Sequence, residues 1–139
     1  MNQILDPFNR KITYLRVSVT DHCNYRCLYC REEDHVTHTK RSEVLSFEEI
    51  AKIVKLFAEL GVTKVRLTGG EPLLRKDILD LTSMLGKIPG INDIPLSTNA
   101  HLLPSLATQL RKNGVNRANI SIDSLNPKRF KESTRDGNL

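Results

Sequence analysis

The architecture of this chain can be read from one stretch, Ser46-Phe-Glu-Glu-Ile-Ala-Lys-Ile-Val-Lys-Leu-Phe-Ala-Glu-Leu-Gly-Val-Thr-Lys-Val-Arg-Leu-Thr-Gly-Gly70. It opens with a capping box, in which the Ser46 hydroxyl and the Glu49 carboxylate satisfy free N–H groups at a helix start. Apolar residues then share one helical face until Gly61, a typical helix end. These are Ile50, Ile53, Val54, Phe57 and Leu60. Residues 64–68 alternate like a strand and run into Gly69-Gly70-Glu71-Pro72.

The same alternation of strands and helices extends in both directions from this stretch. Strands are predicted at 14–19, 94–97 and 119–122, and helices at 77–85, at 105–113 and from Asn126-Pro127 onward. Strands that alternate with helices indicate an α/β fold with a parallel sheet and right-handed crossovers. Because a complete (β/α) barrel needs roughly 250 residues, we expect the N-terminal half of a TIM-like barrel with about four β/α units, as one domain over 1–139.

Composition narrows the class of protein. The chain has 139 residues, of which 39% are hydrophobic and 27% charged, as in an ordinary globular domain. It has no apolar run of membrane-spanning length and no secretory signal pattern, so we expect a cytoplasmic protein that contacts no membrane. The net charge of +5 suits an anionic ligand such as a nucleotide. No nucleic-acid partner is expected, because lysines and arginines form no stripe with interleaved aromatics.

The three cysteines lie within eight residues, directly after the first predicted strand; they are Cys23, Cys27 and Cys30. A disulfide framework favours an even number spread along the chain, so this grouping indicates a metal or a cluster. Three thiolates suit a [4Fe–4S] cluster whose fourth iron stays open to a small molecule. The alternatives are incidental thiols, or zinc with a fourth ligand from His22, His35 or His38. Paired zinc knuckles are absent from the sequence, which favours the cluster.

Several segments together resemble the radical S-adenosylmethionine (SAM) enzymes. The first is Leu15-Arg-Val-Ser-Val-Thr-Asp-His-Cys-Asn-Tyr-Arg-Cys-Leu-Tyr-Cys30. The others are the arm 6–12, Thr68-Gly-Gly-Glu-Pro-Leu73, Ser97-Thr-Asn99 and Ser121-Ile-Asp-Ser-Leu125. The combination covers essentially the whole chain and is similar to the N-terminal part of the GTP 3′,8-cyclase family of molybdenum cofactor (molybdopterin) biosynthesis.

The resemblance implies a specific reaction. A [4Fe–4S] cluster on the three cysteines would bind SAM and reduce it, releasing a 5′-deoxyadenosyl radical. That radical would take the 3′ hydrogen of GTP, and the ribose radical would attack C8 of guanine to give 3′,8-cyclo-7,8-dihydro-GTP. The resemblance also implies a downstream partner enzyme, cyclic pyranopterin monophosphate synthase, and a homodimeric parent protein.

The resemblance also implies contacts to SAM from Tyr29, Gly70 and Ser121. Each position has a plain structural alternative. Tyr29 could be an aromatic packing residue, Gly70 part of a strand-to-helix turn and Ser121 an inward-facing barrel serine. Asp123 could equally be structural.

On the substrate side, the family positions that match Arg16, Lys64, Arg66 and Thr98 contact GTP. Strand alternation places Lys64 and Arg66 on one face, and an arginine binds phosphate through a bidentate fork. The alternative is a solvent-exposed face near the barrel mouth.

The chain departs from the family pattern in places. Arg31-Glu32-Glu33 stands where Met or Leu and then Pro are usual, and Ala100 replaces the glycine of Thr-Asn-Gly. Full-length cyclases carry a second cluster on three further cysteines. We therefore expect a truncated radical SAM core that is not active alone. The alternatives are another radical SAM enzyme, such as a peptide-modifying one, and a non-catalytic iron–sulfur or zinc-binding remnant.

Overall fold

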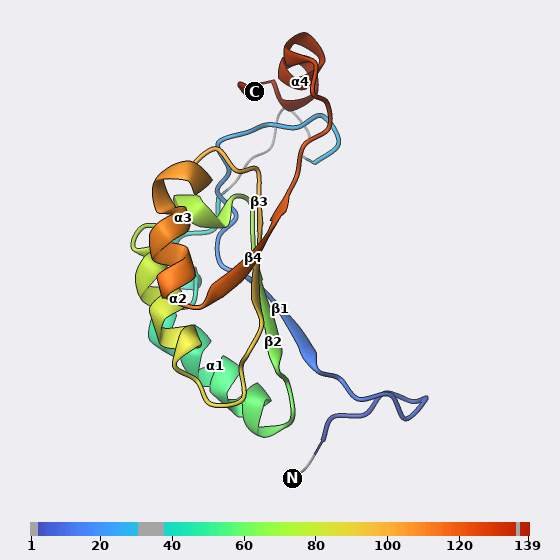
Figure 1. Ribbon diagram of the computed structural model, residues 1–139, viewed down its shortest axis with the longest axis vertical. Helices are drawn as coiled ribbons and strands as arrows, with labels where there is room; N and C mark the ends of the chain where they lie inside the picture. The colour runs from blue at the N-terminus through green and yellow to red at the C-terminus, as the bar shows by residue number, and fades with distance from the viewer. Residues whose placement is uncertain (1–2, 31–37, 136) are drawn as a thin grey trace.

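The computed structural model describes residues 3–30, 38–135 and 137–139, and it contains a four-stranded parallel sheet (Figure 1). The strands are β1 (Tyr14–Ser18), β2 (Lys64–Thr68), β3 (Ile94–Thr98) and β4 (Val115–Ile120), in the spatial order β1-β2-β3-β4. The helices are α1 (Phe47–Glu59), α2 (Ile78–Gly86), α3 (Leu103–Lys112) and α4 (Pro127–Thr134), with short 3-10 turns η1 (Arg41–Glu43) and η2 (Pro72–Leu74). The predicted α/β class and the four alternating units are confirmed.

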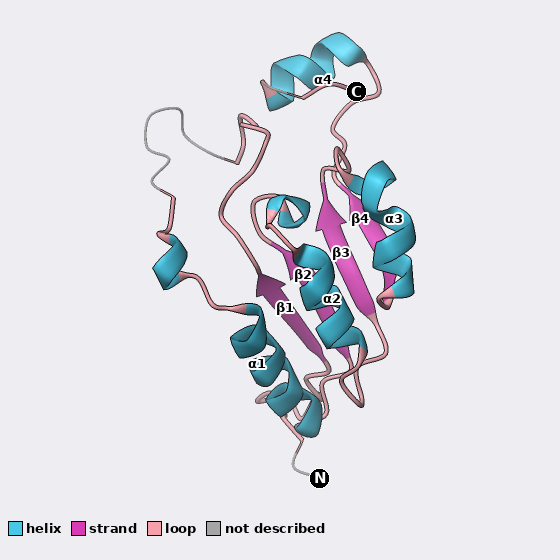
Figure 2. Cartoon of the chain, turned by 90° about the vertical axis from the view of Figure 1, so that its left-hand side faces the viewer, coloured by secondary structure: helices cyan, strands magenta, loops and turns pink. Residues whose placement is uncertain are grey.

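The helices α1, α2 and α3 all cover the same face of the sheet (Figures 1 and 2). The core lies between these two layers and includes the fully buried side chains Val54, Val65, Leu67, Leu81 and Leu96. Burial of each such side chain contributes about 1.5–3 kcal/mol. None of the described helices covers the opposite face, and α4 lies beyond the carboxyl ends of the strands.

The first helix begins where the sequence predicts. The Ser46 hydroxyl accepts a hydrogen bond from Glu49 N at 3.1 Å, and the Glu49 carboxylate accepts one from Ser46 N at 2.7 Å. Its buried face is narrower than predicted, however, because Ile53 is 38% and Leu60 36% exposed. The reason is that α1 lies at one end of the helix layer, with α2 as its only helical neighbour in that layer among the described residues.

The bounds of the fourth strand differ from the prediction. The strand covers Val115–Ile120 rather than 119–122, and Val115 is its one buried residue. Because β4 is an edge strand with exposed, mostly polar side chains, hydrophobic alternation does not mark it. Ser121 therefore lies just after the strand, although its backbone N still donates to Thr98 O at 2.9 Å.

The other predicted helices and strands agree with the structure to within two residues at each end. The apolar residues Ile78, Leu81 and Leu85 of α2 and Leu110 of α3 are buried. No helix within the described ranges combines the length and the apolar character needed to cross a membrane.

Candidate functional site

The cysteine loop, residues 20–30, leaves the sheet at the carboxyl end of β1. The backbone N of Val19 donates to Thr68 O at 2.8 Å, so β1 and β2 stay paired up to the start of the loop. All three cysteines are free thiols; Cys23 and Cys27 are half-buried and Cys30 is exposed. Parallel α/β folds bind their ligands at this edge of the sheet.

The far end of the chain holds this loop in place. Arg26 N donates to Thr134 O at 3.1 Å, and Leu28 N donates to Ser133 O at 3.0 Å. The buried Tyr25 ring meets the Phe130 ring edge-on, with a centroid distance of 5.9 Å. The loop is thus fixed by backbone bonds and an aromatic contact to α4, independently of its thiols. No local pattern in the sequence predicts this contact, because it joins segments about a hundred residues apart.

The two glycines after β2 allow the backbone of the loop that follows this strand to lie directly against the backbone of the cysteine loop. Gly70 N donates to Thr20 O, and Glu71 N to His22 O, each at 2.7 Å. A Cβ atom on Gly70 would lie 2.2 Å from the His22 carbonyl oxygen, and one on Gly69 would lie 2.4 Å from the Thr20 carbonyl oxygen. Only glycine fits at either position. The SAM contact of Gly70 stays a prediction beside this packing role.

Glu71 joins the ends of β2 and β3 from a buried position, with 1% of its surface exposed. Its Oε1 accepts hydrogen bonds from Leu73 N at 3.0 Å and from the Thr98 hydroxyl at 2.8 Å, and its Oε2 accepts one from Asn99 N at 2.7 Å. The Asn99 side chain in turn donates to Asn24 Oδ1 at 2.8 Å. The buried carboxylate therefore connects the sheet to the cysteine loop, a role that sequence reasoning missed.

Thr98 contributes its hydroxyl to this network. The residue is 3% exposed, and its role as a GTP contact stays a prediction. The neighbouring Ser97 is partly exposed. Because Leu96 pairs with the buried Leu67, strand alternation turns Ser97 toward the open face of the sheet.

The predicted basic residues gather on the open face. Arg16 is the register partner of Arg66, and Tyr14 that of Lys64, on adjacent strands. The Lys64 ammonium lies 4.9 Å and the Arg66 guanidinium carbon 5.6 Å from the centre of the Tyr14 ring, within cation–π range. The buried Arg66 Nε has no hydrogen-bond partner. Such a donor suits an anionic ligand.

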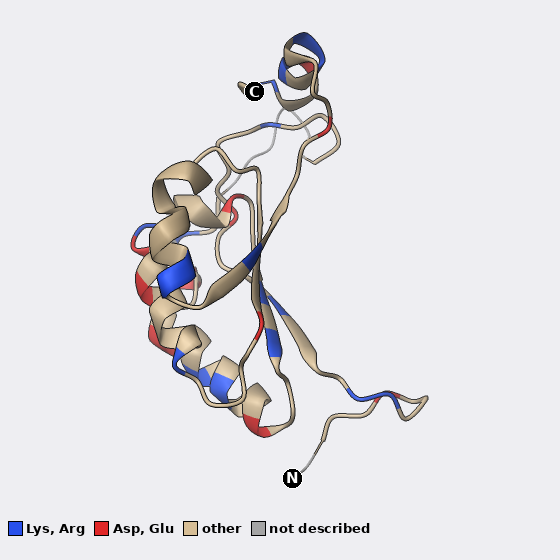
Figure 3. Ribbon diagram, viewed as in Figure 1, with Lys and Arg blue, Asp and Glu red and all other residues tan. Residues whose placement is uncertain are grey.

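A further cation on this face was missed. Arg117 of β4 pairs in register with Pro95, and its guanidinium lies 2.5 Å from Asp93 Oδ2. Lys64 Nζ lies 3.8 Å from the same oxygen. Figure 3 shows lysine and arginine positions along the strands. Arg117 was missed because the predicted fourth strand began at residue 119, which left Arg117 in a loop.

The other two residues predicted to contact SAM, Tyr29 and Ser121, lie beyond the carboxyl ends of the strands. Tyr29 is 69% exposed, and its hydroxyl donates to Asp123 Oδ2 at 2.9 Å. This hydrogen bond raises the pKa of Tyr29. Ser121 is exposed just past β4.

Burial raises the pKa of the Cys27 thiol, so an incoming metal must displace its proton.

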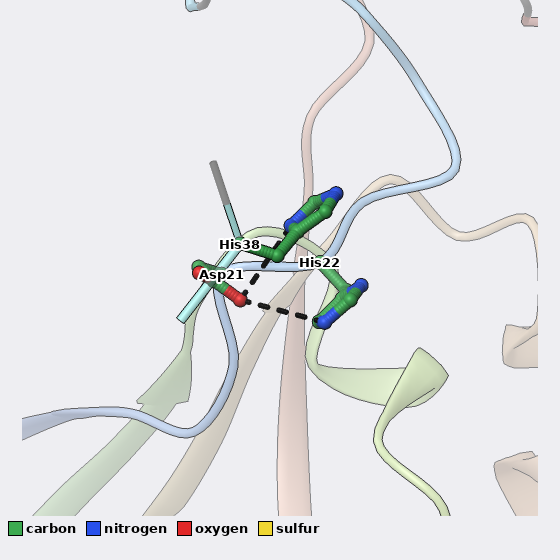
Figure 4. Close-up of side chains that lie close together, drawn as sticks. All are labelled: Asp21, His22 and His38. Carbon is green, nitrogen blue, oxygen red and sulfur yellow. Dashed lines mark ion pairs between the residues drawn. The ribbon is translucent and has the colours of Figure 1, made fainter. Parts of the chain in front are cut away.

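The histidines pair with a carboxylate, as Figure 4 shows. The rings of His22 and His38 stack with centroids 3.9 Å apart, and His22 Nε2 and His38 Nδ1 each lie 3.7 Å from Asp21 Oδ1. The Asp21 carboxylate accepts a hydrogen bond from Thr39 N, which lowers its pKa to about 2. His35, the third predicted alternative ligand, lies outside the described residues.

The spacing of the thiols bears on the choice between zinc and a cluster. Among the described residues, the donor atoms that gather within 4.8 Å of one another are those of Asp21, His22 and His38, and no cysteine sulfur belongs to such a group. One zinc ion with Zn–S bonds of about 2.3 Å would hold its sulfurs no more than about 4.6 Å apart. A [4Fe–4S] cluster takes each thiolate on a different iron, so it does not require the three sulfurs to lie this close together.

The family follows from the whole chain. The family model of the radical SAM superfamily matches residues 17–139. The chain belongs to the radical SAM superfamily. Members of this superfamily use a [4Fe–4S] cluster and SAM, which agrees with the donor set of the cysteine loop.

Curated relatives of this radical SAM chain include two GTP 3′,8-cyclases. The protein from Hydrogenovibrio crunogenus is 53% identical over 137 residues, and that from Saccharophagus degradans is 52% identical over 136 residues. Each match covers 98% of this chain and 41% of the relative. The chain therefore spans about two fifths of the length of these relatives.

Solved structures show the same fold at lower identity. Streptococcus suis SuiB bound to precursor peptide SuiA superposes with a TM-score of 0.70 at 20% identity, over 87% of this chain and 26% of that one. BtrN in complex with AdoMet and 2-DOIA gives 0.60 at 18% identity, over 86% and 46%. These likenesses support the partial-barrel description of the sheet.

Proposed function

We propose that this radical SAM chain supplies the cluster-binding and SAM-binding part of a GTP 3′,8-cyclase. The observation that carries the proposal is the identity of 53% and 52% with two such cyclases over nearly the whole chain. The arrangement of side chains supports it, because a three-thiol loop and a basic strand face occur on one sheet. A complete protein of this type would form 3′,8-cyclo-7,8-dihydro-GTP for cyclic pyranopterin monophosphate synthase.

In this proposal the cysteine loop holds a [4Fe–4S] cluster through Cys23, Cys27 and Cys30. When bound, that cluster supplies the electron that breaks the sulfonium bond of SAM. Tyr29, Gly70 and Ser121 would orient SAM at the carboxyl ends of the strands. The bond from Tyr29 to Asp123 fixes the ring in one orientation before any ligand arrives.

The GTP triphosphate would lie on the open face against Arg16, Lys64 and Arg66. Arg66 is the strongest candidate, since its buried Nε lacks a protein partner and a charge-assisted bond to phosphate would satisfy it. The match spans 41% of each of these cyclases, and we expect cyclisation of GTP to need residues outside this span as well. We expect the chain to bind the cluster, SAM and GTP but not to form 3′,8-cyclo-7,8-dihydro-GTP.

The first test is spectroscopic. After anaerobic reconstitution with iron and sulfide, we expect a reduced [4Fe–4S] EPR signal that changes when SAM is added, because three thiolates would leave one iron open to SAM. Uptake of zinc instead of iron, or an EPR signal that does not change when SAM is added, would contradict the proposal. Either result would favour the alternative of a non-catalytic metal-binding remnant.

A second prediction concerns Arg66. The variant Arg66→Ala is expected to bind GTP at least about tenfold more weakly, because a charge-assisted hydrogen bond contributes about 1.5–3 kcal/mol. Equilibrium dialysis at fixed salt measures the affinity. Arg111→Ala, which removes the same charge from the exposed surface of α3, is the matched control and should bind within twofold of the parent chain, as expected of an exposed group. Equal affinities for the two variants would favour the peptide-modifying alternative.

A further inference from the structure

Beside the cysteine loop lies a second set of metal-ligating side chains that the proposed function does not use. His22 Nε2 and His38 Nδ1 each lie 3.7 Å from Asp21 Oδ1 (Figure 4). This distance exceeds that of a hydrogen bond. The oxygen is nevertheless buried and has no hydrogen-bond partner. A buried carboxylate oxygen without a partner is costly, so a ligand that binds this oxygen would stabilise the arrangement.

We propose that Asp21, His22 and His38 form a binding site for one divalent transition metal such as zinc, separate from the cysteine loop's cluster. A nitrogen about 2.0–2.1 Å from zinc and an oxygen about 2.0–2.2 Å from it can be at most about 4.3 Å apart. The two nitrogen-to-oxygen distances of 3.7 Å fall inside that limit. Tetrahedral geometry would bring these two nitrogen–oxygen pairs to about 3.4 Å. The two imidazole rings are stacked nearly parallel, at 8°, so at least one ring must also turn before both nitrogens can direct their lone pairs at one metal ion.

The chemistry of the donors selects the metal. Two neutral imidazoles and one carboxylate suit zinc and its neighbours in the first transition row, whereas Mg²⁺ and Ca²⁺ prefer oxygen ligands throughout. Thr39 N donates to the other carboxylate oxygen of Asp21 and so fixes the orientation of the carboxylate. His22 and Thr39 also line a cavity of about 780 Å³. Water from this cavity can fill the remaining coordination positions.

The test needs a chain whose thiols cannot compete for zinc. In a variant with Cys23→Ser, Cys27→Ser and Cys30→Ser, calorimetric titration with zinc chloride at pH 7 should give one zinc ion per chain. The zinc absorption edge should show nitrogen and oxygen neighbours at about 2.0–2.2 Å and no sulfur at about 2.3 Å. Adding His38→Gln should weaken binding at least about tenfold, since even outer-shell changes at metal sites cost 10–100-fold.

His101→Gln is the matched control, because His101 is exposed and belongs to no group of metal-ligating donors among the described residues. This variant should bind zinc as tightly as its parent. Absence of stoichiometric zinc binding in the cysteine-free chain, or equal affinities for His38→Gln and His101→Gln, would overturn the proposal.

A second preparation covers the case in which the cysteine-free chain does not fold. In the iron–sulfur-reconstituted chain with all three cysteines, one additional zinc ion should bind, and Asp21→Asn or His38→Gln should remove it. No additional zinc there would equally overturn the proposal. The result is independent of the proposed cyclase function, because the EPR response to SAM is recorded separately on the same sample.

Discussion

Replacing Cys27 with serine is expected to abolish iron–sulfur assembly and SAM cleavage while the chain stays folded. Serine presents a hydroxyl in place of the thiolate that an iron requires. The loop does not depend on that thiol for its shape, since the neighbouring Arg26 and Leu28 amides bond to Thr134 O and Ser133 O. Cys27 is only half-buried, so the packing cost of the exchange is small.

The measurements are iron content per chain, 5′-deoxyadenosine formed from SAM under dithionite, and the thermal midpoint of unfolding. We expect no iron–sulfur signal and no product above background, with a midpoint close to that of the unreconstituted parent. Leu28→Ala is the matched control within the same loop, because Leu28 is 58% exposed and offers no metal ligand. Full iron loading in Cys27→Ser would show that the cluster uses other ligands.

Much of the fold follows from local patterns in the sequence. The capping box at Ser46, the stop at Gly61 and the strand 64–68 could be predicted because each depends on neighbouring residues. The fourth strand could not be bounded in this way. Its residues are exposed at the edge of the sheet, so pairing with β3, rather than its own hydrophobicity, determines where it begins.

The same distinction between local patterns and long-range contacts applies to the candidate site. The cysteine spacing and the shared face of Lys64 and Arg66 are local properties and were predictable. The contact of α4 with the cysteine loop, the ion pair of Arg117 with Asp93 and the grouping of His22 and His38 around Asp21 all join distant segments or depend on loop conformation. The sequence carries no periodic signal for such contacts.

Glu71→Gln is the second change with a large expected effect. The carboxylate accepts hydrogen bonds from Leu73 N, the Thr98 hydroxyl and Asn99 N in a buried position. A glutamine amide keeps the shape but replaces one acceptor oxygen with an NH₂ donor. That donor would face the Asn99 N–H or the Leu73 N–H, and neither orientation satisfies every group.

We expect the variant to lose about 2–4 kcal/mol of unfolding free energy, because a buried donor without a partner costs about 1–3 kcal/mol and a charge-assisted bond is lost as well. Urea unfolding measures this loss. Glu59→Gln, an exposed position at the end of α1, is the matched control and should change stability by less than about 0.5 kcal/mol. Equal urea midpoints for the two variants would contradict the buried-acceptor role of Glu71.

The same substitution also tests whether Glu71 positions the cysteine loop. Asn99 links the carboxylate to Asn24, the residue that follows Cys23. If Glu71 acts through this link, Glu71→Gln should lower the iron content of chains that remain folded. Asn24→Ala should lower the iron content as well. Combining the two changes should then cost less than the sum of their separate effects, since either one already breaks the connection. Additive losses would show that Glu71 stabilises the sheet ends without reaching the cysteine loop.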